Sequence, residues 1–178
     1  SDVNKRQGDA TIVATKAQSV DVFVWKVTNG VVNPTPQKYA FPVATPSYYW
    51  NVVPMPVGMT GYMGFFSTSA TNGLIWMNST MGEVSRSSGV RTSGGDVITI
   101  NGRVYVAYTA YSGDQKGVMR ICDITDGKYN QIFNYTMEAS GANGNGTASA
   151  CLMVKNNELY AVFGCTGSGL YFYRIACK

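Results

Sequence analysis

The sequence contains no histidine. Ser-His-Asp and Cys-His catalysis both need an imidazole as the base, and many zinc sites need one as a ligand. The four cysteines are too widely and irregularly spaced to suggest a zinc site made of cysteines alone. We therefore expect no metal ion, no cofactor and no histidine-dependent enzyme chemistry.

Charged side chains are also scarce, at 13% of residues, against about 25% in an average protein. The net charge of +4 is scattered, and its densest run is Lys5 and Arg6. Because no basic cluster interleaves with aromatic residues, we expect no nucleic-acid partner. Glycoside hydrolysis needs a pair of carboxylates, and most of the ten Asp and Glu residues lie in expected turns. A carboxylate-based glycoside hydrolase is therefore the least favoured hypothesis, and we expect that the protein is not an enzyme.

Long apolar runs are missing as well. No stretch approaches the roughly 18 apolar residues that cross a bilayer, so we expect no membrane span. The first residues do not have the pattern of a signal peptide. We interpret Ser1, Asp2 and Val3 as a start made by processing or by excision from a longer chain.

One stretch of strand-forming residues recurs along the chain. The copies are residues 21–30 (DVFVWKVTNG), 73–82 (GLIWMNSTMG), 118–127 (VMRICDITDG) and 169–178 (GLYFYRIACK). The first three end in Thr-x-Gly, and the copies follow one another at intervals of about 50 residues. This period predicts a chain built from repeated structural units.

The third unit shows the expected contents of a repeat most clearly. Residues 97–100 (VITI) and 103–110 (RVYVAYTA) flank Asn101 and Gly102, a pair typical of a tight hairpin. Residues 118–127 and a more polar strand at 129–137 complete four short antiparallel strands. Helical periodicity of useful length is absent. We predict an all-β fold with units at about 9–45, 48–92, 95–137 and 147–178.

Apolar inner strands and a polar outer strand resemble the blades of a β-propeller. The resemblance is carried by the hairpins VITINGRVYVAYT and CLMVKNNELYAVFG and by the echoes FVWKVTNG and MRICDITDG. Low charge with abundant Tyr, Gly and Asn is similar to the secreted propeller domains of unknown function in Bacteroidetes lipoproteins. The resemblance implies one domain over residues 1–178, a β-propeller or a portion of one with about four blades. It also implies an exported bacterial protein in the periplasm, at the cell surface or secreted.

The ends of the chain leave two ways to complete such a ring. The first unit has no clear first strand, and the last has no fourth strand after Lys178. Either residues 1–8 close the ring against the last blade, or the chain is part of a larger propeller. The second alternative is favoured, and it predicts an apolar face at each end that needs the rest of its own chain or self-association.

The cysteines can be tested against the expected hairpins. The turn at Asn156 and Asn157 places Cys151 opposite about residue 162, and the turn at 166–168 places Cys165 opposite about residue 170. A disulfide needs Cα atoms within roughly 7 Å, so these hairpins do not pair the cysteines. We expect free, mostly buried thiols at Cys122, Cys151, Cys165 and Cys177, with a bridge between blades through Cys122 as the alternative.

Aromatic residues mark a candidate binding face. In a propeller, the loops carrying Tyr48, Tyr49 and Trp50 and carrying Tyr111 and Asp114 emerge on the same side. Flat rings beside a carboxylate could stack and hydrogen-bond a sugar, although aromatic residues also fill sheet cores.

The leading hypothesis is thus a non-catalytic ligand-binding or scaffolding module, with a glycan as the first ligand to try. The alternative is a protein-interaction platform within a larger propeller. That alternative predicts a large apolar patch on the flank of the first or last blade.

Overall fold

The computed structural model describes residues 8–16, 18–41, 50–54, 63–67, 74–78, 80–87, 91–111, 117–136, 149–165 and 169–176. These residues form fifteen β-strands and no helix. All strand pairs among these described residues are antiparallel, so the prediction of an all-β antiparallel fold is confirmed. Within the described ranges, no helix is long and apolar enough to cross a bilayer.

The strands form four separate sheets, each made of consecutive strands. Sheet 1 contains β1 (Ala10–Thr15), β2 (Asp21–Thr28), β3 (Val31–Val32) and β4 (Gln37–Ala40). Sheet 2 contains β5 (Trp50–Pro54), β6 (Met63–Ser67), β7 (Leu74–Met77) and β8 (Glu83–Ser87). Sheet 3 contains β9 (Arg91–Ile100), β10 (Arg103–Tyr111), β11 (Gly117–Asp123) and β12 (Asn130–Thr136). Sheet 4 contains β13 (Ser149–Lys155), β14 (Glu158–Cys165) and β15 (Gly169–Ile175).

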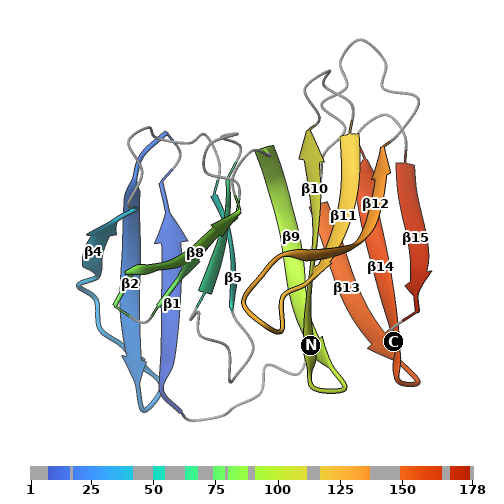
Figure 1. Ribbon diagram of the computed structural model, residues 1–178. Coiled ribbons are helices and arrows are strands. Elements are labelled where there is room, and N and C mark those ends of the chain that lie inside the picture. Colours follow the sequence, from blue (N-terminus) through green and yellow to red (C-terminus); the bar gives the residue numbers. More distant parts are fainter. Residues whose placement is uncertain are drawn as a thin grey trace.

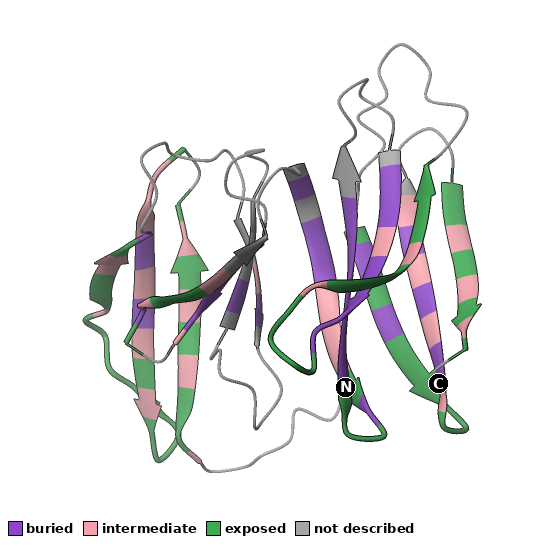
Figure 2. Ribbon diagram, in the orientation of Figure 1, coloured by how far each residue is buried: buried purple, intermediate pink, exposed green. Residues whose placement is uncertain are grey.

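The four sheets do not close a ring. Figure 1 shows sheet 1 at the left end of the molecule and sheet 4 at the right end, with sheets 2 and 3 between them. Three clusters of buried side chains join successive sheets, and Figure 2 colours the buried residues of the strands purple. The clusters centre on Val22 and Met77 between sheets 1 and 2, on Trp76 and Val106 between sheets 2 and 3, and on Ile121 and Phe163 between sheets 3 and 4.

Two hairpins turn through the same backbone conformation. Ile100 pairs with Arg103 across Asn101 and Gly102, which confirms the hairpin predicted there. Asn101 and Gly102 have φ angles of 51° and 73°, and Asn156 and Asn157 have 51° and 61°. Positive φ at both central residues suits the right-handed twist of the strands, which explains the use of Asn and Gly.

Two of the three Thr-x-Gly turns are held by the side chain of a residue that precedes them. Asp123 Oδ1 accepts hydrogen bonds from the backbone N of Thr125 at 3.0 Å and from its Oγ1 at 2.6 Å. Asn78 Oδ1 accepts the same two bonds from Thr80, at 3.0 and 2.8 Å, and a third from the backbone N of Gly82. In these two turns the motif is Asx-x-Thr-x-Gly, in which the Asx side chain replaces backbone partners, whereas Lys26 occupies the Asx position before Thr28.

Asp123 also forms the buried half of an ion pair. Its Oδ2 accepts a hydrogen bond from Arg103 Nε at 2.7 Å and contacts the Nη2 of the same arginine. Burial raises the pKa of Asp123, but the hydrogen bonds from Thr125 and Arg103 outweigh it and hold that pKa below its ordinary value. The carboxylate thus ties the end of β11 to the start of β10.

The cysteine predictions are partly confirmed. Cys151 pairs with Val162 as predicted, and Cys165 pairs with Gly169, within one residue of the predicted position near 170. Cys122 is free and buried, so the bridge through Cys122 is wrong. Cys151 is free but exposed, which corrects the expectation that it is buried. Cys177 and the side chain of Cys165 lie outside the described residues.

One substitution in the turn of each hairpin will test their shared backbone conformation. Gly102→Ala places a Cβ at a positive φ, where it meets no other atom within 4 Å, so the cost of about 1 kcal/mol comes from the backbone alone. Asn157→Gly removes the strain of a positive φ at the equivalent position, so it will raise the free energy of unfolding by about a few tenths of a kcal/mol. Urea unfolding measures both changes, and a neutral Gly102→Ala variant would contradict the turn assignment.

Substitutions at Asp123 will separate the turn from the ion pair. Asp123→Ala will cost about 1–3 kcal/mol, because it removes buried acceptors. Asp123→Asn will cost less, because Asn78 shows that an amide oxygen supports the same turn. The exposed Asp126→Ala serves as the matched control and will cost clearly less than Asp123→Ala.

The pH dependence of these variants has a defined sign. The folded state depresses the pKa of Asp123, so its stabilising contribution is complete above about pH 4 and is lost as the pH falls through the lowered pKa. The stability difference between the wild type and Asp123→Asn will therefore stay constant from pH 7 to 5 and shrink below about pH 4. A difference that grows on acidification would exclude the ion pair as its source.

Candidate functional site

The predicted sugar-binding residues fall at the margins of the described structure. Tyr48, Tyr49 and Asp114 lie outside the described residues. Trp50 is the first residue of β5 and Tyr111 is the last residue of β10, but their side chains are not among those described. The glycan-binding face therefore stays a prediction from the sequence.

The clearest functional feature arises from the strand of each sheet that carries the recurring stretch. β2, β7 and β11 align through their Thr-x-Gly turns, and β15 aligns with β11 by matching Ile175 to Ile124. Successive side chains of a strand point to opposite faces. In β7, Leu74 and Trp76 pack toward sheet 3, while Ile75 and Met77 pack toward sheet 1. Each aligned strand thus has a forward set, toward the next sheet, and a backward set, toward the preceding sheet.

The forward set changes its environment at the end of the array. Its first three pairs are at most 5% exposed: Val22 and Val24, Leu74 and Trp76, Met119 and Ile121. The fourth pair, Leu170 and Phe172, is 67% and 71% exposed. Apolar side chains that cover the next sheet elsewhere therefore face solvent on sheet 4.

The neighbouring strands continue this exposed surface. Phe172 lies beside Val162, which lies beside Cys151, and the exposed Met153 follows on β13. We call this surface the trailing face and define it by the residues Cys151, Met153, Tyr160, Val162, Leu170, Phe172 and Arg174.

At the other end, the backward set of sheet 1 is exposed on β1 and half-buried on β2. Ile12 lies beside Trp25, and Ala14 lies beside Phe23. The Phe23 and Trp25 ring centroids are 6.2 Å apart, and Ile12 is 46% exposed. We call this surface the leading face and define it by the residues Ala10, Ile12, Ala14, Phe23, Trp25 and Val27.

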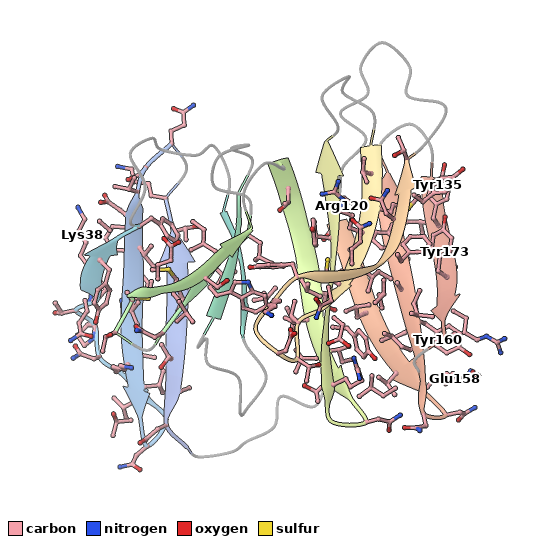
Figure 3. All side chains as sticks on the ribbon, in the orientation of Figure 1. Lys38, Arg120, Tyr135, Glu158, Tyr160 and Tyr173 are labelled. Carbon is pink, nitrogen blue, oxygen red and sulfur yellow. The ribbon has the colours of Figure 1, made fainter. Side chains whose placement is uncertain are left out.

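Each end face has a charged pair at its border, and Figure 3 shows Lys38 and Glu158 at opposite ends of the molecule. Lys38 Nζ lies 3.1 Å from Asp21 Oδ1, and the hydrogen bond from Lys38 holds the pKa of Asp21 below its ordinary value. Arg174 Nη1 lies 3.3 Å from Glu158 Oε1. Each of these ionised groups is therefore paired with an opposite charge at the border of its face, and the centres of both faces remain apolar.

Tyr160 takes part in the border of the trailing face. Its hydroxyl donates a 2.6 Å hydrogen bond to Glu158 Oε2, and this bond raises the pKa of Tyr160. The hydroxyl therefore remains protonated and holds the Glu158 side chain beside Arg174.

Cys151 is the accessible thiol of the trailing face. Partial burial raises its pKa, and the nearby negative charge of Asp96 raises it further. Asp96 Oδ2 accepts a hydrogen bond from the backbone N of Leu152 at 2.9 Å, which fixes the carboxylate between β9 and β13. A thiol with a raised pKa is a poor nucleophile at neutral pH.

The described carboxylates have structural roles. Asp123 is the buried carboxylate among the described residues, and Arg103 and Thr125 occupy its oxygens. Within the same residues, no cluster of three or more Cys, Asp or Glu could hold a metal ion. Asp123 therefore has a structural role at the turn that follows β11.

Comparison with known proteins adds no family assignment. A scan against protein-family models gave no match, and a search of curated proteins found none that is similar to this chain. The end faces must therefore be interpreted from their own chemistry.

The sequence predicted an apolar face at each end, but Leu170 and Phe172 were not identified as residues of that face, although the repeat alignment points to them. Matching Ile175 to Ile124 also matches Leu170 to Met119 and Phe172 to Ile121. Exposed residues at buried repeat positions are what the end of an open array predicts.

Thiol labelling will test the accessibility of the trailing face. We expect N-ethylmaleimide to modify Cys151 in the folded chain and to modify Cys122 at least about a hundredfold more slowly, because Cys122 needs local opening. Because the pKa of Cys151 is raised, its rate will keep rising above the pH at which an ordinary thiol levels off. Peptide mapping by mass spectrometry separates the sites, and equal rates would contradict the assigned burial.

Proposed function

We propose that the chain is a non-catalytic interaction module, a four-blade segment of a β-propeller whose two end faces bind further sheets of protein. The observation that carries the proposal is the exposure of Leu170 and Phe172 at positions that are buried in the other three sheets. Contiguous exposed apolar surface on a folded protein marks an interaction site.

The free energy available from these faces supports this function. Fully burying a Leu or Phe side chain contributes about 1.5–3 kcal/mol. Each end face presents several such groups, including Phe172 and Met153 on one and Ile12 and Trp25 on the other. Binding would therefore gain several kcal/mol before the cost of association is subtracted.

The arrangement of sheets supports the propeller part of the proposal. Consecutive antiparallel strands form each sheet, and successive sheets pack face to face. The outer strands β4 and β12 are almost entirely exposed, whereas β7 is fully buried. Propeller blades have this division between buried inner strands and wet outer strands. Export to the periplasm, the cell surface or the medium belongs to the same proposal and is supported by the resemblance in composition.

A dye that fluoresces on exposed apolar surface tests the proposal at low chain concentration. Phe172→Glu and Ile12→Glu each place a charge in one end face. We expect each change to lower the fluorescence, and the double variant to lower it at least about threefold.

Ile132→Glu is the matched control. Ile132 lies on the outer strand β12 and has the same 46% exposure as Ile12. The control should keep the wild-type fluorescence. Circular dichroism verifies that every variant is folded, and a folded double variant with undiminished fluorescence would refute the proposed function.

A further inference from the structure

We propose that the partner of each end face is a second copy of this chain. The leading face of one copy packs on the trailing face of the other, and two such contacts join two copies into one closed ring. This inference rests on the proposed function, because it assigns an occupant to the same two faces.

The first argument is that the two faces are the two halves of an interface that already exists inside the chain. Between sheets 3 and 4, the forward residues Met119 and Ile121 meet the backward residues Leu159, Ala161 and Phe163. Leu170 and Phe172 repeat Met119 and Ile121 on sheet 4. The trailing face is therefore a forward face that lacks its backward partner.

The leading face supplies the missing half. The pairing of β1 with β2 places Ala10, Ile12 and Ala14 at the positions that Leu159, Ala161 and Phe163 occupy on β14. In sheets 3 and 4 these positions are fully or almost fully buried: Val104, Val106 and Tyr108 on β10, and Leu159, Ala161 and Phe163 on β14. In sheet 1 they are exposed, although Ile12 is as apolar as its equivalents.

The shapes of the two faces favour this pairing over pairing of like with like. The trailing face has large central side chains, Phe172 and Met153, and the leading face has small ones on β1, Ala10 and Ala14. Large against small is how packed layers interdigitate. All three internal clusters join a forward set to a backward set.

Pairing of two different faces limits the kinds of assembly that can form. A contact between two different faces is heterologous, so it makes a ring if the rotation closes and a filament if it does not. Two copies contribute four sheets each, and the resulting eight is within the usual range of about four to eight propeller blades. The expected species is a discrete dimer.

Mixing two face variants tests the inference. Phe172→Glu destroys the trailing face of every copy, and Ile12→Glu destroys the leading face of every copy. Either variant alone should therefore be a monomer of the 19.2 kDa chain. An equimolar mixture retains one intact leading face and one intact trailing face, so it should form a one-to-one dimer by light scattering.

The wild type should have twice the chain mass. Each variant alone should raise the dissociation constant of the dimer at least about tenfold, which makes it a monomer where the wild type is a dimer. Ile132→Glu should dimerise as the wild type does. Leu170→Glu and Ala14→Glu repeat the test at other exposed positions, in case one of the first substitutions impairs folding.

Three outcomes would overturn the inference. A wild type that stays monomeric with dye-binding faces would exclude the second copy while preserving the proposed function. A dimer broken by only one variant would show like-with-like pairing, and open-ended polymers would exclude the ring. If both face variants assemble as the wild type does and also bind dye undiminished, the proposed function fails as well.

Discussion

The structure depends on one constraint: every sheet is apolar on both faces, so each face needs another sheet against it. In β7, all four residues are buried, because alternate side chains enter two different cores. A β-strand that faces water on one side shows a polar alternation instead. A sheet of this kind cannot be stable alone, and the array has no natural end of its own.

The turns give successive sheets the same strand ends, so the same packing between sheets can repeat. Asn78 and Asp123 cap equivalent turns with the same pair of hydrogen bonds to a threonine. The cap fixes where the third strand ends, and that in turn fixes which residues point forward. A slip of one residue would exchange the forward and backward sets.

The sequence predicted local features well and also predicted an apolar face at each end of the array, but it did not identify the residues of those faces. Asn101 and Gly102 predicted a hairpin because both turn positions need positive φ, and the symmetry of a hairpin placed Cys151 beside Val162. The exposure of Cys151 was not predicted. Counting residues from a hairpin turn identifies the neighbour on the adjacent strand, but it does not show whether another sheet packs on that face. The candidate site followed the same division. Leu170 and Phe172 are apolar residues of the kind found in a core. They are exposed because no further described sheet packs on sheet 4.

The scarcity of charge supports the proposal that protein covers these faces. Soluble proteins usually protect an exposed sheet with charged or bulky polar side chains. Here the charged side chains of the end sheets lie at the borders, as in the pairs Lys38 with Asp21 and Arg174 with Glu158. The centre of each face therefore remains apolar, with Phe23 beside Lys38 at one end and Phe172 two residues before Arg174 at the other. A surface designed only to meet water would place such charges across Leu170 and Ile12, so their confinement to the borders favours faces that are covered by protein.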